Sequence, residues 1–387
     1  MSLSRRSFVR SLGIGAGAML SSRAIGARGW EAYRFGEEAD FDSSEIILSS
    51  NENPMGPGNV VMEAIQNGLG ASGSPVGRYP FAYRSPLTEA IAERFNVKPE
   101  NILVGCGSTQ VLVTATHVYT SKDRHLTGAL PTYEECSDYA AFIGAPVRSV
   151  PLDSDYRMDM DRTLHAARGS GLLFYCNPNN PVSTMISNSQ TKDFLTRMLA
   201  YSPETRILVD EAYIDYVTDP EHESMIPLAL TDPRVIVART FSKAYGMAGM
   251  RIGYAIAHAD TIKEMGQFHQ GNSISLLSYV AATAAIQTGE KFIENERERN
   301  RQVRDFTTDF FRQAGHTVAD SQTNFLFVDV GMPIQEFQAA CKERGVRVGR
   351  PFPPLWTHCR ISLGTMEEMQ RATRVFGQVL EKAKRAA

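Results

Sequence analysis

The sequence lacks long apolar runs and an excess of charge of either sign. A membrane-spanning helix needs about 20 consecutive apolar residues, and no stretch beyond the N-terminal segment approaches that length. Lysine and arginine number 40 against 43 aspartate and glutamate, for a net charge of −3, which argues against a nucleic-acid-binding surface. With 387 residues, 43% of them hydrophobic, the chain has ordinary globular composition and room for two domains with substantial cores.

Cysteine is scarce and irregularly spaced. The five residues form no CxxC pair and are odd in number, which argues against a disulfide framework and a zinc site. We expect buried thiols and no bound metal, in a protein that folds in the cytoplasm. The cysteines are Cys106, Cys136, Cys176, Cys341 and Cys359.

The N-terminus carries a separate signal. "SRRSFVR" is followed by a small, uncharged stretch from Ser11 to Ser22 that is too short to span a bilayer. This segment resembles a twin-arginine (Tat) export signal, with Arg5 and Arg6 as the pair and Phe8 in the apolar position. The resemblance implies export to the periplasm by the Tat machinery, and the alternative is a disordered basic tail on a cytoplasmic protein. Residues 1–28 are therefore set apart from the fold.

From residue 100 onward, short apolar strands alternate with helical patterns. This alternation predicts an α/β fold, with a large domain built on a mixed, mostly parallel seven-stranded sheet and helices on both faces. The sheet is mixed because the loop between the last two strands leaves no room for a helix. The expected strands are Ile102–Val104, His125–Thr127, Val147–Val150, Leu172–Tyr175, Ile207–Val209, Val235–Ala238 and Ile252–Ile256; the expected helices are Thr109–Tyr119, Tyr133–Ile143, Asp159–Ala167 and Asn188–Tyr201.

The remaining segments suggest a second, smaller unit. A long helical stretch runs from Tyr279 through Gln313, followed by strands at Asn324–Val330, Val346–Val348 and Cys359–Leu363 and a terminal helix. The predicted organisation is an N-terminal arm over 29–85, a large domain over 86–285 and a small α+β domain over 286–387. The arm is rich in Asn, Pro and Gly between Glu45 and Ser85, and we expect it to lie across the site.

Polar groups follow successive predicted strands. In open α/β sheets, ligands bind beyond the carboxyl ends of the strands. A glycine-rich turn, Gly105 to Thr109, follows the first strand and opens a helix, where backbone N–H groups favour a phosphate. Asn177 to Pro181 follows the fourth strand, Asp210 ends the fifth, Lys243 follows the sixth and Arg251 precedes the seventh. Each residue alone has an ordinary explanation as a cap, a turn former or a surface cation.

Taken together, these groups meet the needs of pyridoxal 5′-phosphate. This cofactor requires a lysine amine for its Schiff base, an anion at its ring nitrogen, donors at its phenolic oxygen and an anion-binding cradle. Lys243 and Asp210 meet the first two needs, and Asn180 and Tyr213 the third. The predicted phosphate ligands are Ser108, Thr109, Thr240, Ser242 and Arg251, and Tyr133 is expected to stack on the ring.

The chain also resembles a known family. "SSNENPMGP" (49–57), "RYP" (78–80), "LPTYEECSDYAAFIG" (130–144), "CNPNNP" (176–181), "VDEAY" (209–213), "TFSKAYGMAGMRIGY" (240–254) and "CRISLGT" (359–365) are similar to the class I/II aminotransferases of PLP fold type I, most closely the histidinol-phosphate aminotransferase subgroup.

The resemblance implies roles for individual residues. Lys243 is the Schiff-base lysine, Asp210 the ring-nitrogen partner and Arg251 a phosphate ligand. Arg360 is expected to hold the substrate carboxylate in a bidentate pair, with Asn53 also assigned to the substrate site. Arg350, in "VGRPFPP", is assigned there as a second substrate-facing cation, and the alternative is a surface arginine in a loop. Tyr79 would reach the cofactor phosphate of a neighbouring subunit, which implies a homodimer with shared sites.

Two motifs depart from the family pattern. The family usually has Asn-Pro-Thr-Gly where this chain has Asn180-Pro181-Val182-Ser183, so the turn loses its glycine. The cradle reads Gly-Ser-Thr-Gln where histidinol-phosphate enzymes usually carry an acidic residue. These departures leave the cofactor chemistry intact and the substrate open.

The predicted reaction is transamination between an L-amino acid, or an amine like histidinol phosphate, and a 2-oxo acid. Freed Lys243, its pKa lowered by the site, moves the Cα proton. The alternative on the same scaffold is a PLP-dependent amino-acid oxidase, cyclase or decarboxylase. A catalytically silent binding protein is a third possibility, against which the intact set of Lys243, Asp210 and Arg360 argues.

Overall fold

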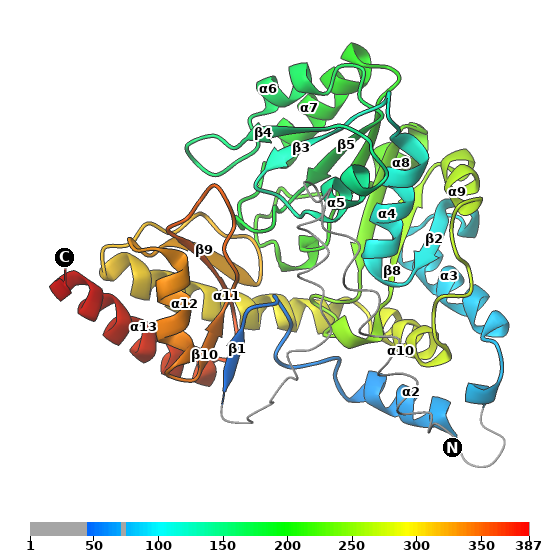
Figure 1. Ribbon diagram of the computed structural model, residues 1–387. Coiled ribbons are helices and arrows are strands. Elements are labelled where there is room, and N and C mark those ends of the chain that lie inside the picture. Colours follow the sequence, from blue (N-terminus) through cyan, green and yellow to red (C-terminus); the bar gives the residue numbers. More distant parts are fainter. Residues whose placement is uncertain (1–44, 71–74, 387) are drawn as a thin grey trace, which may run out of the picture. The chain divides into compact units, whose positions relative to one another are not determined.

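The computed structural model describes residues 45–70 and 75–386, shown in Figure 1. The proposed export signal lies outside these residues, as does the first part of the predicted arm. Among the helices of the described ranges, none combines the length and apolar character needed to cross a membrane.

A seven-stranded sheet forms the centre of the larger part of the chain. Its strand order is β2-β8-β7-β6-β5-β3-β4, and only β8 runs antiparallel to its neighbours. The predicted α/β fold with a mixed, mostly parallel sheet is therefore confirmed. The strands are β2 (Ile102–Gly105), β3 (Leu126–Leu130), β4 (Val147–Pro151), β5 (Leu172–Cys176), β6 (Arg206–Asp210), β7 (Val235–Thr240) and β8 (Gly253–Ala257).

Helices cover both faces of this sheet. One buried cluster joins alternate strand residues to α4 (Gly107–Tyr119), α5 (Glu135–Phe142) and α9 (Ala259–Gly266). The other cluster joins the intervening strand residues to the helices of the opposite face, as period-two side-chain alternation requires. Those helices are α3 (Phe81–Phe95), α6 (Met160–Ala166), α7 (Asn188–Tyr201), α8 (Ile226–Thr231) and α10 (Leu276–Gln287); α2 (Asn59–Leu69) packs on α10.

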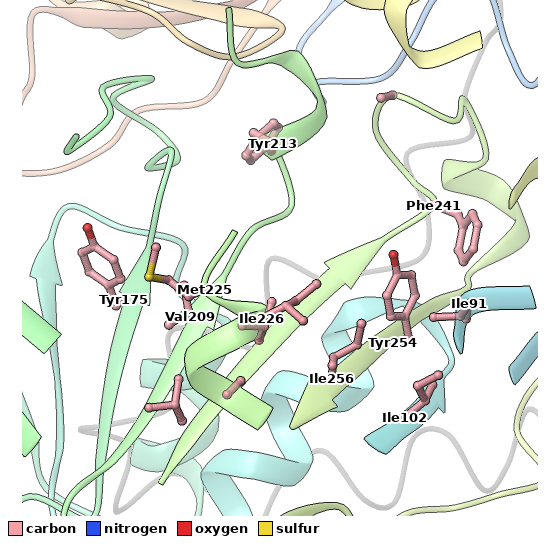
Figure 2. Close-up of a cluster of buried hydrophobic side chains, with 14 of the residues drawn as sticks. Ile91, Ile102, Tyr175, Val209, Tyr213, Met225, Ile226, Phe241, Tyr254 and Ile256 are labelled. Atoms are coloured by element: carbon pink, nitrogen blue, oxygen red, sulfur yellow. The ribbon is translucent and has the colours of Figure 1, made fainter. Parts of the chain in front are cut away.

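Figure 2 shows part of this second cluster, with Ile102, Tyr254 and Ile256 on neighbouring strands. Phe241 belongs to the same cluster and directly precedes the turn that carries Lys243. Its ring lies 5.6 Å from that of Tyr254. The buried core therefore reaches the turn on which the predicted cofactor lysine stands, and packing on this ring fixes where the turn begins.

The C-terminal residues build a separate buried cluster. Strand β11 (His358–Ser362) pairs antiparallel with β9 (Phe325–Asp329), and β10 (Val346–Val348) pairs in parallel with β1 (Ile46–Leu48). Three helices complete this region: α11 (Glu290–Gln313), α12 (Ile334–Lys342) and α13 (Met366–Ala386). The strand β1 was not predicted, because its three residues have a partner 300 positions away in the sequence.

The predicted continuous helix from Tyr279 to Gln313 is wrong. The structure has two helices, α10 and α11, separated at Thr288 and Gly289. Gly289 has φ 78°, a left-handed conformation that interrupts a right-handed helix. The domain boundaries at 28, 85 and 285 stay predictions.

Candidate active site

Strand register brings the predicted groups to one edge of the sheet. Cys176, the last residue of β5, pairs with Asp210 of β6, and Asp210 pairs with Ala238 of β7. Gly253, which opens β8, lies between Gly105 of β2 and Thr240 of β7. The loops that carry the lysine, the carboxylate and the glycine-rich turn therefore leave the sheet side by side.

Lys243 lies half-buried in the turn after β7 and contacts the segment around Ser50. Its Nζ donates to the Ser50 carbonyl at 3.3 Å and lies 5.6 Å from the centre of the Tyr213 ring. Burial lowers the pKa of the Lys243 ammonium to about 8, assisted by the positive charges of Arg360 and Arg251. An amine with this pKa is neutral in a substantial fraction of molecules near pH 8, as a nucleophile or general base requires.

Asp210 ends β6 with only 3% of its surface exposed. One oxygen accepts a hydrogen bond from the Ala212 N–H at 3.1 Å, and the other lies 3.9 Å from the Cys176 thiol. Burial raises the pKa of the Asp210 carboxyl to about 7, against the opposing effects of the Ala212 N–H and of Lys243. The carboxylate has no ion-pair partner within 4 Å among the described residues, and an adjacent cation would lower its pKa.

The start of α4 fits tightly against β8. A Cβ added at Gly253 would lie 2.4 Å from the Ser108 nitrogen, and one at Gly107 would lie 2.7 Å from an Arg251 nitrogen. Gly107 also has φ 69°, which favours glycine. The first turn of the helix, with Ser108 and Thr109, is thus held where its backbone N–H groups can face an anion.

Arg251 closes the other side of this turn. Its guanidinium donates to the Ser242 hydroxyl at 3.5 Å, and the Thr240 hydroxyl donates to Ser242 at 3.0 Å. Arg251 itself has φ 52°, an uncommon backbone conformation for a residue with a side chain. The five predicted phosphate ligands thus lie at the start of α4, at the end of β7 or on the loop between β7 and β8.

Arg360 lies on β11 and reaches the same site. Its guanidinium donates to the Asn180 side-chain oxygen at 2.7 Å and to the Ser49 carbonyl at 2.6 Å. Ser49 and Ser50 are consecutive, so one short segment contacts both Arg360 and Lys243. This segment is part of the predicted arm across the site.

The other predicted residues differ in how they are placed. Asn53 is buried and donates to the Ala244 carbonyl at 2.9 Å, next to Lys243. Tyr133 lies half-buried between β3 and α5, against the cluster that covers that face. Arg350 forms an ion pair with Glu134. Tyr79 is 76% exposed, and its ring stacks on that of Phe81.

Sequence reasoning missed Asn51. Its side-chain amide donates to the Tyr213 hydroxyl at 3.1 Å, and it exchanges two hydrogen bonds with Ser362 on β11. Asn51 is 1% exposed and has φ 57°, which asparagine tolerates better than most residues. The available signal was an asparagine that follows the apolar triplet Ile46–Leu48 after two serines, in "IILSSNENP".

The residues present fit pyridoxal phosphate. Asp210 is a buried carboxylate without a close cation, which a protonated ring nitrogen would supply. The α4 start, Ser242 and Arg251 form a cradle of donors for a phosphate. Lys243 is enclosed near Tyr213 and has a lowered pKa. Within the described ranges, no cluster of three His, Cys, Asp or Glu residues is placed to hold a metal ion.

Comparisons with known proteins agree with this reading. Residues 43–376 match the family model "Aminotransferase class I and II". The histidinol-phosphate aminotransferase of Bacillus velezensis is 33% identical over 341 residues, covering 87% of this chain and 91% of that protein. The crystal structure of the histidinol-phosphate aminotransferase from Sinorhizobium meliloti, in complex with pyridoxal-5′-phosphate, has a TM-score of 0.80 at 25% identity, covering 88% of this chain and 91% of that chain.

A more distant structure supports the fold alone. An aspartate aminotransferase mutant from Thermus thermophilus is 22% identical, with a TM-score of 0.76 over 86% of this chain and 96% of that chain. The agreement of fold, site and family model leads to one conclusion: the chain belongs to the class I and II aminotransferases and is a pyridoxal-phosphate-dependent transaminase of the histidinol-phosphate aminotransferase type.

Proposed function

We propose that Lys243 is both the cofactor's covalent anchor and the base of the transamination. The observation that carries the proposal is the placement of its half-buried amine beside Tyr213 and Ser50, with a pKa lowered to about 8. Pyridoxal phosphate, when bound, supplies an electron sink for the negative charge that develops at the substrate Cα. The neutral Lys243 amine would accept the substrate Cα proton and deliver it to the C4′ carbon of the cofactor.

The surrounding side chains orient and hold charge. Asp210 keeps a positive charge on the cofactor ring nitrogen, since an ionised buried carboxylate needs a cation beside it. Asn180 and Tyr213 would donate hydrogen bonds to the cofactor's phenolic oxygen, and Arg251 with the start of α4 would hold its phosphate. Asn51 positions the Tyr213 hydroxyl through its hydrogen bond. The segment from Ser49 to Asn53 contacts this region, because the Ser50 carbonyl accepts a hydrogen bond from Lys243 and Asn53 donates one to the neighbouring Ala244 carbonyl.

The donor is an amine that carries an anionic group at the Arg360 end of the site. Arg360 has a buried Nε without a hydrogen-bond partner among the described residues, so this guanidinium retains donor capacity for a substrate anion. The names of the relatives make histidinol phosphate one candidate donor, and an L-amino acid with an α-carboxylate is the other. The acceptor is a 2-oxo acid.

Borohydride trapping tests the anchor. The cofactor-loaded protein is reduced, digested and analysed by peptide mass spectrometry. The proposal predicts a single reduced cofactor adduct on the peptide containing Lys243, and no adduct in Lys243→Ala. Finding the adduct on another lysine of the wild-type chain would overturn the assignment.

We further propose that two chains associate and that Tyr79 serves the neighbouring site. Tyr79 stacks on Phe81 with ring centres 5.5 Å apart, and both rings are largely exposed. Exposed apolar residues gathered over one short stretch indicate an interaction surface. The set is Met55, Val60, Met62, Leu69, Val76, Tyr79 and Phe81.

We also propose export through the Tat pathway, on the basis of the motif around Arg5 and Arg6. Tat carries folded proteins, so the cofactor would be loaded before transport. Replacing both arginines with lysine is expected to leave an active enzyme in the cytoplasm, as measured by activity in periplasmic and cytoplasmic fractions. Unchanged recovery from the periplasm would refute the export signal.

A further inference from the structure

Two guanidinium groups lie against one buried ring at the predicted anion-binding end of the site. The Cζ atoms of Arg350 and Arg360 lie 4.4 and 4.8 Å from the centre of the Phe352 ring, which is 3% exposed. Cations over an aromatic face gain favourable electrostatic energy and a defined position. The shared ring therefore holds two positive charges within reach of the same substrate group.

A carboxylate of the chain neutralises only one of these charges. Arg350 forms an ion pair with Glu134 and donates to the Pro351 carbonyl at 3.1 Å. Arg360 donates to two neutral acceptors, Asn180 and Ser49, and forms no ion pair within 4 Å in the described part of the chain. One unpaired positive charge thus remains for a ligand.

Glu134 is placed to influence what binds there. It directly precedes α5 and follows Tyr133, the residue predicted to stack on the cofactor. The side chains of Glu134 and Arg350 are 42% and 53% exposed, so the pair is open to solvent. The pKa of the Arg360 guanidinium is lowered by burial and responds in opposite directions to the charges of Arg350 and Glu134, which places all three groups in one electrostatic environment.

We infer that Glu134 is a specificity-determining residue that favours a carboxylate over a phosphate at this end of the substrate site. A carboxylate carries one negative charge and matches the single unpaired guanidinium of Arg360. A phosphate monoester carries about −1.5 to −2 at neutral pH, and balancing it requires Arg350 as well. Arg350 becomes free only if Glu134 leaves it.

Releasing Glu134 is unfavourable for a further reason. Its helix already carries Glu135 and Asp138 in the first turn, and burial raises the pKa of both of these carboxyls. Without Arg350 beside it, the Glu134 carboxylate would repel these two carboxylates more strongly. The Glu134–Arg350 ion pair therefore lowers the affinity of the site for dianionic substrates. Specificity can arise in this way, by weakening the binding of a competing ligand. The inference rests on the proposed function, because it requires Arg360 to bind the substrate anion.

A matched pair of donors tests the inference. L-histidine and L-histidinol phosphate share the amine and the imidazole and differ in the anionic group. In Glu134→Gln, which keeps the shape and removes the charge, the ratio of kcat/KM for histidinol phosphate to that for histidine is expected to rise about tenfold over wild type. The change should come mainly from the KM of the phosphate donor, since the pair acts on binding.

Two further variants distinguish the effect of the Glu134–Arg350 ion pair from a non-specific effect of removing a carboxylate near the site. Adding Arg350→Gln to Glu134→Gln should return the ratio toward the wild-type value, because the freed guanidinium is then removed. Asp138→Asn removes a carboxylate from the same helix that forms no ion pair within 4 Å with any residue the structure describes, and should change the ratio less than about threefold.

The outcomes distinguish this inference from the proposed function. If both donors are turned over and Glu134→Gln leaves their ratio unchanged, Glu134 does not set specificity, while the transaminase assignment stands. If Asp138→Asn shifts the ratio as much as Glu134→Gln, the specific pairing with Arg350 is refuted. Failure of the proposed function would appear separately, as a borohydride adduct on a lysine other than Lys243.

Discussion

Burial sets the chemistry of the two central charged residues in opposite directions. Asp210 is buried and Lys243 half-buried, and loss of solvation lowers the pKa of the ammonium to about 8 and raises that of the carboxyl to about 7. Each shift disfavours the charged form. Lys243 thereby gains a neutral amine for proton transfer, whereas Asp210 becomes costly to ionise until a cation binds next to it.

This cost predicts that Asp210→Asn stabilises the cofactor-free protein. The pKa of Asp210 is about 7 when folded and 3.8 in the reference state, so the folded state binds the extra proton between these values. The contribution of Asp210 to the free energy of unfolding therefore falls as pH rises from about 4 to 7, and it stays low above pH 7. At pH 8, Asp210→Asn should raise the free energy of unfolding by about 2 to 4 kcal/mol.

Urea unfolding of the cofactor-free protein at pH 8 and pH 5 measures this effect. The gain should shrink at pH 5, where folded Asp210 is mostly protonated. In the presence of pyridoxal phosphate, the same variant should bind the cofactor more weakly and lose activity. A loss of stability of equal size at both pH values would show that Asp210 is not under electrostatic strain.

Some site residues were predicted from the sequence and others were missed. The two groups differ in how far along the chain their contacting residues lie. Lys243, Asp210 and Arg251 follow or precede apolar strands, so strand order predicts that they meet. The contacts of Asn51 and Glu134 depend on segments far apart in the chain, at Tyr213 and Arg350. Neither the period of the strands nor local turn chemistry encodes such contacts.

The loop after β5 keeps its turn without the usual glycine. Ser183 adopts φ 65°, the left-handed region in which a side chain costs about 1–2 kcal/mol. It is fully buried, and its hydroxyl has no hydrogen-bond partner in the described ranges. The backbone geometry is retained through hydrogen bonds to Asn179 and Gln322.

We therefore expect Ser183→Gly to stabilise the protein. The substitution removes the left-handed strain and the unpaired hydroxyl, which stabilises the folded state. Glycine also has more conformational freedom in the unfolded chain, which offsets part of this stabilisation. The net increase in the free energy of unfolding should be about 1 kcal/mol, measured by chemical denaturation. Ser183→Ala keeps the strained Cβ and should gain less. Destabilisation by Ser183→Gly would contradict this account of the turn.

At the level of elements, the sheet was predictable because its central strands, β5 to β8, are buried on both faces. Continuous apolar runs such as Leu172–Cys176 stand out locally. The break between α10 and α11 was missed because apolar and charged residues continue in helical spacing on both sides of Gly289. Strand β1 was missed because it has three residues, and these form a strand through pairing with β10, which is distant in the sequence.

For the whole molecule, the proposed shared sites predict complementation between inactive chains. Lys243→Ala lacks the anchor, and Tyr79→Ala lacks the residue that serves the neighbour. A mixed dimer of the two has one site with both defects and one intact site. Random re-association should therefore restore intact sites to about a quarter of the total.

Activity after mixing, with sedimentation analysis of the oligomeric state, measures this outcome. Mixing Lys243→Ala with Asp210→Asn is the matched control. Both residues serve the site of their own chain, so each site of the mixed dimer still carries one defect and no activity should return. Absence of restored activity in confirmed mixed dimers, or a monomeric wild type, would refute the sharing of Tyr79.

The most direct test of the central claim is the visible absorption of the purified protein during each half-reaction. With pyridoxal phosphate bound through Lys243, the protein should be yellow and should bleach on addition of an amino donor. The colour should return on addition of a 2-oxo acid, and Lys243→Ala should show no such cycle. A protein that binds pyridoxal phosphate but retains its spectrum with every amino donor would contradict the assignment of Lys243 as the base of a transamination.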